Sequence, residues 1–340
     1  MLKYGDRIGI VCCSNGHKPS YGENLKRLET ILLKMGLRVT FSDCIFEKQN
    51  GIGGTGQERA RELMNFYRDD EIKGIFDISG GDIANGILPY LDYDVIADSG
   101  KIFWGYSDLT TVINAIYAKT GKASVLYQVR NLLYGYAEGG ASVEEMHSAT
   151  ENPSINESRS MEEKHSMEDS QSMEVGHSMG KGLSGHEQIA DSRGVILFRN
   201  TVINGGSDLF RIKYRFLQQK EMQGTVIGGN IRCFLKLAGT EYMPDLDGKI
   251  LLLEAFHGMP PQIETYLRQL QQLGAFERAA GILLGTFTQM EAEKCTPTVE
   301  TLIREIVGKD LPIAVTADIG HGTDSKAIII GQELHLMEGA

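Results

Sequence analysis

The stretch Lys101-Ile-Phe-Trp-Gly-Tyr-Ser-Asp-Leu-Thr110, continued by residues 111–121, carries the pattern that decides the fold. Residues 101–106 form a short apolar run, which is typical of a buried β-strand. Directly after it, apolar residues recur at the spacing of one helix face, at Leu109, Val112, Ile113 and Ile116. A strand that runs straight into a helix predicts a βα unit of an α/β protein.

The same alternation of apolar runs and helical stripes continues on both sides of this unit. Before it, strands are expected at 8–11, 38–41 and 74–78, and helices at 21–35 and 60–67. Beyond it, strands are expected at 195–198, 225–227, 249–253, 281–284, 313–316 and 327–330, and a helix at 263–273. Strands that alternate with helices of this length pair in parallel. The sequence therefore predicts an N-terminal doubly wound parallel-sheet domain and a smaller C-terminal α/β domain.

A low-complexity segment separates the two regular parts. Ser-Met recurs there every six residues, at Ser160, Ser166, Ser172 and Ser178. Polar, Ser-rich and acidic sequence buries too little apolar surface to offset its ordering entropy. We expect three segments: an N-terminal domain at 1–141, a flexible insertion or linker at 142–192, and a C-terminal domain at 193–340. Four histidines within the insertion allow a metal-binding interpretation, but their irregular spacing favours a solvated expansion.

The charge of the chain excludes some classes of partner. Asp and Glu number 45 against 34 Lys and Arg, a net charge of −11, and residues 140–193 alone contribute −7 of it. An acidic protein is a poor partner for nucleic acid or an anionic membrane, whose phosphates require a basic face. We expect neither partner.

The remaining composition points to the cytoplasm. The first residues lack the pattern of a secretory signal, and no uncharged apolar run of about 18 residues is present. The five cysteines, an odd number, fit a reducing compartment. No CxxC or HxxxH pair offers a metal site, so we expect no metal.

Ser107 is the first candidate for chemistry, because it lies where the strand 101–106 meets its helix. A serine on such a turn is exposed at the strand end, beside the free N–H groups of the helix, which can hold an oxyanion. The turn departs from the G-x-S-x-G pattern because Leu109 replaces the last glycine. A helix N-cap is the alternative role for Ser107.

A base and an acid for this serine are expected in the C-terminal half. Outside the insertion the histidines are His17, His257, His321 and His335. Small residues flank His321 in a turn after an apolar strand, which suggests close approach to another group. Glu254 follows four aliphatic residues, so it would be partly buried and would need a paired donor. A salt bridge at the strand end is the alternative for Glu254.

Two glycine-rich stretches could bind a ligand. Ser79-Gly80-Gly81-Asp82 ends the strand 74–78, and its N–H groups could face Ser107 and form an oxyanion hole with the Asp108 N–H. A tight turn is the alternative. Residues 51–56 satisfy G-x-G-x-x-G, but a polar segment separates them from the nearest strand, which favours a loop over a dinucleotide site.

Eight segments in order resemble the LD-carboxypeptidase family of serine peptidases, most closely its branch of microcin C immunity peptidases. They are YGDRIGI (4–10), SGGDIAN (79–85), LPYL (88–91), GYSD (105–108), IGGN (227–230), GTEYMPDL (239–246), GKILLLE (248–254) and GHG (320–322). The resemblance implies a metal-free, cytoplasmic and commonly dimeric enzyme. Its substrate would be a murein tetrapeptide or an aminoacyl-nucleotide conjugate.

The resemblance also implies roles for individual residues. Ser107 would be the nucleophile, His321 the general base and Glu254 the residue that orients it, and the N–H groups of Gly81 and Asp108 would form the oxyanion hole. Residues that would bind substrate are Gly80, Arg130 and Asn230, and Arg130 is the candidate for a free carboxylate. A surface arginine is the alternative for Arg130.

Three departures from the family pattern bear on substrate identity. They are Tyr127-Gln-Val-Arg-Asn131 where relatives often carry Gly-Pro, Ala255 where they often carry an acid, and the insertion itself. A different class of function, a non-catalytic two-domain binding protein that retains the fold, remains open from the sequence.

Overall fold

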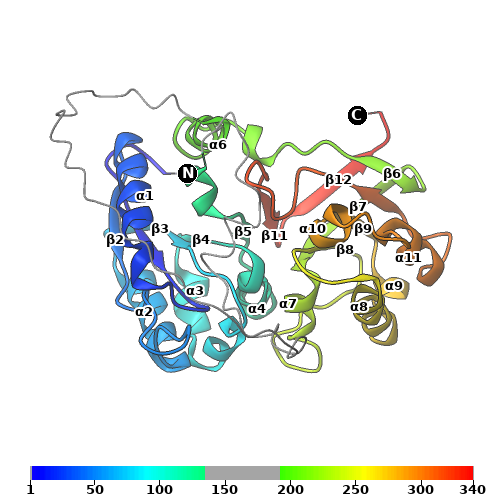
Figure 1. Cartoon of the computed structure of the whole chain (residues 1–340), viewed down its shortest axis with the longest axis horizontal. Coiled ribbons are helices and arrows are strands. Elements are labelled where there is room, and N and C mark those ends of the chain that lie inside the picture. The colour runs from blue at the N-terminus through cyan, green and yellow to red at the C-terminus, as the bar shows by residue number, and fades with distance from the viewer. Residues whose placement is uncertain (1, 135–191, 340) are drawn as a thin grey trace, which may run out of the picture.

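The computed structural model describes residues 2–134 and 192–339, which form two six-stranded sheets. The first sheet lies on the left of Figure 1 and the second on the right. The expected flexible insertion, its Ser-Met repeat and its histidines lie outside the described residues.

The first sheet has the strand order β11-β5-β4-β3-β1-β2. Its parallel strands are β1 (Arg7–Val11), β2 (Arg38–Phe41), β3 (Ile72–Asp77), β4 (Ile102–Gly105) and β5 (Ser124–Leu126). The edge strand β11 (Ile328–Ile330) pairs antiparallel with β5. The order 2-1-3-4-5 reverses between β1 and β3, and ligands of such sheets bind at the carboxyl ends of the strands near that point.

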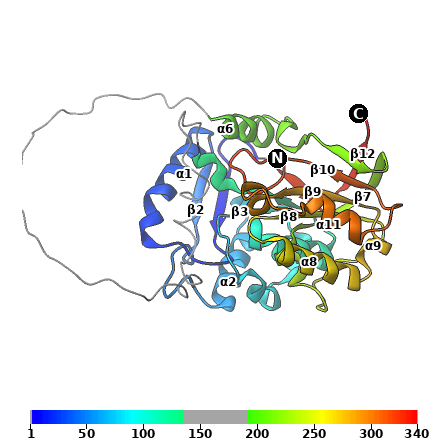
Figure 2. The same cartoon turned by 45° about the vertical axis from the view of Figure 1, so that its right-hand side comes forward.

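Helices cover both faces of this sheet, so the doubly wound architecture is confirmed. They are α1 (Gly22–Lys34), α2 (Gly56–Arg68), α3 (Tyr93–Asp98), α4 (Thr110–Thr120) and α6 (Arg193–Phe198). Successive strand residues point to opposite faces: Phe76 packs in the cluster with α1 and α6, whereas Ile75 packs in the cluster with α2 and α4. Figure 2 shows β2 and β3 between α1 and α2.

The second sheet has the order β12-β7-β8-β9-β10-β6. Its parallel centre is β7 (Glu221–Asn230), β8 (Lys249–Ala255), β9 (Gly281–Phe287) and β10 (Ile313–Val315). Antiparallel strands β12 (Glu333–Met337) and β6 (Arg215–Gln218) form its edges. Its helices are α7 (Ile231–Leu235), α8 (Pro260–Gln272), α9 (Ala275–Arg278), α10 (Thr288–Ala292) and α11 (Val299–Ile306).

The strand expected at 195–198 is wrong, because these residues form α6. The side chain of Ser192 accepts a hydrogen bond from the Val195 N–H and caps the helix. Val195 and Phe198, three residues apart, share its buried side. A four-residue apolar run has the same pattern in a strand and in a short helix, so only the cap separates the two.

The chain returns to the first sheet near its end. The strand expected at 327–330 is present as β11, but it pairs with β5 rather than with the second sheet. In Figure 1, β11 lies beside β5, between the two sheets. The segment between β10 and β11 therefore crosses from one sheet to the other and carries His321 with it.

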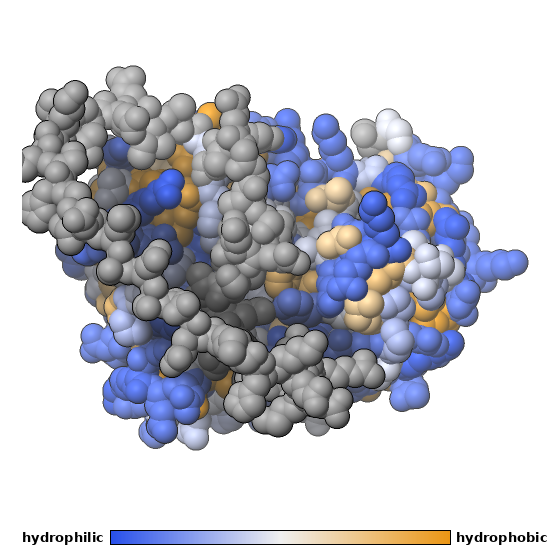
Figure 3. Space-filling view, in the orientation of Figure 1, coloured by the Kyte–Doolittle hydropathy of each residue, from blue (hydrophilic) through white to orange (hydrophobic). Residues whose placement is uncertain are grey.

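The outer surface gives two further observations. No helix within the described residues is long and apolar enough to span a membrane. On the face shown in Figure 3, hydrophilic residues surround several small hydrophobic areas over the second sheet.

Candidate active site

Ser107 occupies a strained turn at the carboxyl end of β4. Its φ is 57°, a left-handed conformation that a residue with a side chain rarely adopts. Gly105 permits the turn, because a Cβ there would lie 2.7 Å from the Cβ of Leu109. The short helix Ser107–Leu109 and then α4 follow, and the side chain of Ser107 caps neither of them. The N-cap alternative is wrong, and the geometry is that of a nucleophile elbow.

His321 and Glu254 lie next to Ser107 and form one chain of hydrogen bonds with it. His321 Nε2 is 3.2 Å from Ser107 Oγ, and His321 Nδ1 is 2.7 Å from Glu254 Oε2. In the tautomer whose Nδ1–H donates to the Glu254 carboxylate, Nε2 accepts from the serine hydroxyl. Glu254 is fully buried on β8. The structure thus brings together all three residues that the sequence singled out.

Aromatic rings hold the imidazole of His321 on two sides. The ring of Tyr106 meets it edge-on with centroids 4.9 Å apart, and the ring of Phe256 lies 5.0 Å away. Burial and the negative charge of Glu254 raise the pKa of the Tyr106 hydroxyl well above its ordinary value. Tyr106 is therefore neutral beside the glutamate.

The segment 79–82, here called the glycine turn, presents backbone N–H groups at the carboxyl end of β3. The Asn15 N–H donates to the Gly80 carbonyl at 3.1 Å. Because the Gly80 carbonyl and the Gly81 N–H point in opposite directions across one planar peptide, this bond turns the Gly81 N–H away from Asn15. Asn15 Oδ1 also accepts from the Asp82 N–H at 3.0 Å. Gly81 has a φ of 114°, so the orientation requires glycine.

Two buried carboxylates, which the sequence analysis missed, fix the loops around the serine. Asp77 accepts from the Cys13 N–H at 2.7 Å and from both the N–H and the hydroxyl of Ser79, at 2.6 and 2.5 Å. It therefore ties the loop after β1 to the start of the glycine turn. Burial raises the pKa of Asp77, and the hydrogen bonds from Ser79 and Cys13 oppose this.

Asp108, the residue after Ser107, is the second buried carboxylate. It accepts from Ser14 Oγ at 2.6 Å and from the Ala84 N–H at 2.8 Å, and it forms an ion pair with Lys236. Its side chain is fully buried, whereas that of Lys236 is 19% exposed. The sequence analysis assigned Asp108 only a backbone role. The side-chain network joins residues more than 90 positions apart, and no local pattern reveals it.

Arg232 of α7 and the nearby Lys236 also bond to the glycine turn. Arg232 donates to the Gly81 carbonyl at 2.9 Å and forms an ion pair with Asp82. Lys236 Nζ donates to the Asp82 carbonyl at 2.8 Å. A helix of the second sheet thus holds a turn of the first sheet in place.

The predicted substrate-binding residues lie in different positions around this centre. Asn230 ends β7 in register with Glu254, and its side chain caps α7 by accepting from the Cys233 N–H. Its own N–H donates to Thr110 Oγ1 at 3.0 Å. Gly80 lies in the glycine turn, and Arg130 follows β5 with its Nη2 3.9 Å from the position of a Cβ at Gly80.

His17, His335 and the glycine cluster 51–56 lie in surroundings that are typical of structural residues. His17 is buried, stacks on Tyr21 and donates from Nε2 to the Ile78 carbonyl at 3.0 Å, and burial lowers the pKa of His17 to about 3. His335 lies exposed on β12 beside Glu221. The glycine cluster 51–56 ends the loop between β2 and α2, with Thr55 as the N-cap and Gly56 as the first residue of α2. It does not follow a strand directly, as a dinucleotide site requires.

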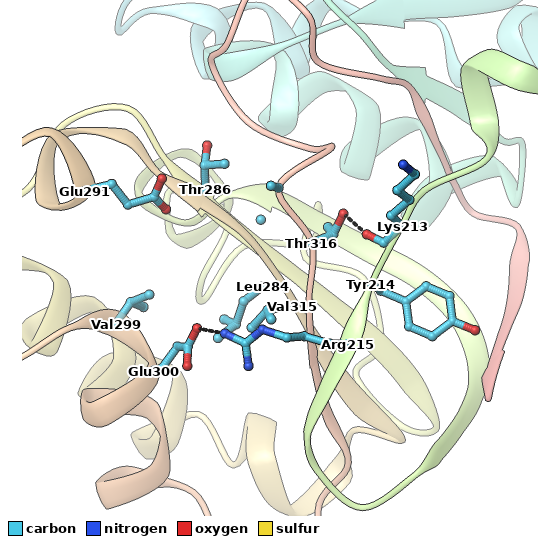
Figure 4. A pocket seen from close by; sticks show the side chains of 12 residues that line it. Lys213, Tyr214, Arg215, Leu284, Thr286, Glu291, Val299, Glu300, Val315 and Thr316 are labelled. Atoms are coloured by element: carbon cyan, nitrogen blue, oxygen red, sulfur yellow. Dashed lines mark hydrogen bonds and ion pairs between the residues drawn. The ribbon is translucent and has the colours of Figure 1, made fainter. Parts of the chain in front are cut away.

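A pocket of about 390 Å³ lies at the carboxyl ends of β9 and β10. Figure 4 shows Arg215 paired with Glu300, and Thr316 bonded to the backbone of Lys213, on its walls. None of the three residues of the hydrogen-bonded chain lines it. Among the described residues, no cluster of three or more His, Cys, Asp or Glu is placed to hold a metal ion.

Known proteins resemble this chain over nearly its whole length. The chain is 25% identical to a probable murein peptide carboxypeptidase of Bacillus subtilis, over 97% of this chain and 88% of the relative. It is 26% identical to the microcin C7 self-immunity protein MccF of Escherichia coli, over 98% and 91%. A structure of MccF in complex with aspartyl sulfamoyl adenosine has the same fold, with a TM-score of 0.67, 22% identity and coverage of 98% and 93%.

Two family models cover the parts of the chain that build the site. The model of the LD-carboxypeptidase N-terminal domain matches residues 8–128, which include the serine turn. The model of the LD-carboxypeptidase C-terminal domain matches residues 223–336, which include Glu254 and His321. The chain therefore belongs to the LD-carboxypeptidase family.

Proposed function

We propose that this protein is a serine carboxypeptidase that hydrolyses an amide bond through an acyl-enzyme. The observation that carries the proposal is the continuous chain from Ser107 Oγ through His321 to Glu254, with distances of 3.2 and 2.7 Å. A serine in a strained turn, a base and an orienting acid together meet the requirements of nucleophilic catalysis.

The proposed reaction assigns a residue to each step. Ser107 Oγ attacks the substrate carbonyl while His321 Nε2 takes the hydroxyl proton. The negative charge on the carbonyl oxygen is then held by the N–H groups of Gly81 and Asp108. His321 returns the proton to the leaving nitrogen, the C–N bond breaks, and the acyl group stays on Ser107. Water that gives a proton to His321 hydrolyses this ester and restores the serine.

Glu254 keeps His321 in the productive tautomer and balances the imidazolium that forms during attack. Its full burial strengthens this charge interaction, because the surrounding dielectric is low. The edge of the Tyr106 ring and the ring of Phe256 restrict the imidazole further.

Two substrate classes are proposed, in line with the relatives. The names of those proteins refer to murein peptide and to microcin C7 immunity. We therefore propose an L,D-linked murein tetrapeptide or an aminoacyl-nucleotide conjugate. In both, the scissile bond is an amide whose carbonyl Ser107 can attack.

The test is incubation with an L,D-linked tetrapeptide and, separately, with an aminoacyl sulfamoyl adenosine, followed by mass spectrometry of the products. The wild type is expected to release one amino acid from the peptide or to cleave the conjugate at its amide. His321→Ala should lower the rate by about 10⁴-fold or more. Ser207→Ala, a change at an exposed serine outside the site, is the control and should leave the rate unchanged.

The alternative of a non-catalytic binding protein makes a different prediction. It expects binding of one of these compounds without turnover, and no dependence on His321. The hydrogen-bond distance between Ser107 and His321 favours the enzyme, because a binding protein has no need to retain it.

A further inference from the structure

The Tyr106 hydroxyl and the Glu254 carboxylate meet where the two sheets join. Tyr106 follows β4 of the first sheet, directly before Ser107, and Glu254 lies on β8 of the second sheet. The two side chains share a hydrogen bond. Within the described residues, neither the Tyr106 hydroxyl nor Glu254 Oε1 has any other hydrogen-bond partner. This contact is therefore additional to the chain that joins Ser107, His321 and Glu254 Oε2.

The other contacts of the two side chains indicate which carboxylate oxygen the hydroxyl serves. Glu254 Oε2 is engaged by His321, whose Nδ1 lies 2.7 Å away. The ring of Tyr106 meets the imidazole of His321 edge-on, with centroids 4.9 Å apart and planes at 65°. Tyr106 thus contacts both the base and the acid that orients it. Oε1 is the oxygen that its hydroxyl can bond without competing with His321.

Packing makes Oε1 depend on a donor from the protein. Oε1 is inaccessible to solvent, and the side chains of Glu254 and Tyr106 are both buried. The backbone of β9 packs against the glutamate, since a Cβ at Gly285 would lie 2.9 Å from the Glu254 Cβ. A buried carboxylate that lacks donors favours its protonated form, which could not balance a charged imidazole.

The Tyr106 hydroxyl keeps its proton in this position. Burial, the negative charge of Glu254 and the hydrogen bond to it raise the pKa of the Tyr106 hydroxyl well above its ordinary value. An ionised carboxylate only accepts, so Tyr106 is the donor and Glu254 the acceptor. Hydrogen bonds to an ionised acceptor are about twice as strong as those between neutral groups.

We propose that Tyr106 is a positioning residue of the catalytic centre, whose hydroxyl donates to Glu254 Oε1 and so holds Oε2 against His321 Nδ1. This inference rests on the proposed function, in which Glu254 orients the general base. The hydrogen bond stabilises the ionised carboxylate that must balance the imidazolium formed during attack. It also ties the residue before the nucleophile to the acid on the other sheet, which fixes the spacing between Ser107 and His321.

Tyr106→Phe tests this role, because it removes the hydroxyl and keeps the ring that contacts His321. On the L,D-linked tetrapeptide or the aminoacyl sulfamoyl adenosine, whichever is cleaved, kcat should fall by about 10- to 100-fold with KM unchanged, since a misplaced base slows the reaction without altering substrate contacts. Tyr67→Phe removes the hydroxyl of another buried tyrosine in the same core cluster and is the matched control. It should leave kcat and KM unchanged. An equal loss in both variants would overturn the proposal.

The pH profile separates positioning from a purely structural role. Without the Tyr106 hydroxyl the carboxylate is less stabilised, so Glu254 and His321 together hold a proton more tightly. The acid limb of the kcat/KM profile should therefore move to higher pH by about 0.5–1 unit in Tyr106→Phe. A loss of correctly folded enzyme would lower the whole profile and leave the limb in place, and that result would contradict the proposal.

A measurement on the resting protein distinguishes failure of this inference from failure of the proposed function. NMR titration of the His321 imidazole, with its resonances assigned by comparison with His321→Gln, requires neither substrate nor turnover. The midpoint should rise by about 0.5–1 pH unit in Tyr106→Phe and stay in place in Tyr67→Phe, even if no substrate is cleaved. Equal midpoints in the wild type and Tyr106→Phe contradict the role of the hydroxyl, whether or not the wild type is an active peptidase.

Discussion

Two sets of cationic side chains lie beside the glycine turn, and they differ in what they contact. Arg232 and Lys236 contact the Gly81 and Asp82 carbonyls and the carboxylates of Asp82 and Asp108. Arg130 contacts no carboxylate among the described residues. Cations that pair with carboxylates stabilise the fold of the site. A cation without such a partner among the described residues can still pair with a ligand.

This difference shows how a site built from two sheets can be held rigid on one side and still have groups for binding substrate on the other. The carbonyl groups of the glycine turn accept hydrogen bonds from Arg232 of α7 and from the Asn15 N–H. The Asp82 N–H also donates to Asn15, so the Gly81 N–H is the group of this turn that we propose for the substrate. Variants on the two sides should therefore separate effects on folding from effects on turnover.

The largest effect is expected at Gly81. Gly81→Ala places a Cβ where it overlaps the side chain of Asn15 and forces a residue with a side chain to a φ of 114°. Loss of the N–H geometry should lower kcat/KM by about 100- to 1,000-fold or more. The matched control is Gly121→Ala at the end of α4, which also forces a residue with a side chain to a positive φ, 69°, but whose Cβ meets nothing within 4 Å. Similar kcat/KM values for the two variants on the L,D-linked tetrapeptide or on the conjugate would contradict the assignment of the oxyanion hole.

The next effect is on stability and concerns Lys236. Lys236→Met leaves the buried carboxylate of Asp108 without its cation, which should lower the free energy of unfolding by about 3–5 kcal/mol. Arg232→Met is the comparison, because the exposed pair with Asp82 should contribute only about 0–1 kcal/mol. Urea unfolding measures both. A loss in Arg232→Met as large as that in Lys236→Met would break the distinction between buried and exposed pairs.

Arg130 should behave in the opposite way to Lys236. Arg130→Met removes a buried nitrogen with no partner among the described residues, so the free energy of unfolding should change by no more than about 0.5 kcal/mol or should rise. The same urea titrations provide the value. A loss comparable with that of Lys236→Met would show that Arg130 is a structural cation.

A separate effect is a pH dependence that involves His17. Burial and the charge of Arg130 lower the pKa of His17 from 6.5 to about 3, so between these values the unfolded chain binds a proton that the folded protein does not. The free energy of unfolding should therefore fall as the pH falls through this window. His17→Gln should reduce that fall, and Arg130→Met should reduce it less by raising the pKa of His17. Unfolding at about pH 7 and about pH 4.5 measures the difference, and an identical fall in all three proteins would contradict it.

The sequence predicted most of the first sheet and the catalytic candidates because these depend on local pattern. Strands at 38–41 and 74–78 follow from apolar runs between helical stripes, and β2 and β3 lie there. Ser107 could be identified because a strand-to-helix junction is visible in about ten residues. The small residues around His321 and the four aliphatic residues before Glu254 singled out these two, and the family motifs then gave them roles.

The parts that escaped prediction depend on contacts between distant segments. A four-residue run at 195–198 has no period long enough to separate strand from helix, and the cap at Ser192 decides it. The pairing of β11 with β5 and the bonds from Asn15 to the glycine turn join segments far apart in the chain. Composition could not show that Asp108 would be buried against Lys236 of another sheet.

The most direct test of the central claim is the reaction of the protein with a fluorophosphonate, followed by peptide mass spectrometry. If His321 activates Ser107 as the nucleophile, a single phosphonyl adduct should form on the peptide that contains Ser107. It should be absent in Ser107→Ala, and its formation should be slower by about 10³-fold or more in His321→Ala. An adduct on another residue, or hydrolysis of the tetrapeptide or of the conjugate that persists in Ser107→Ala, would contradict the claim.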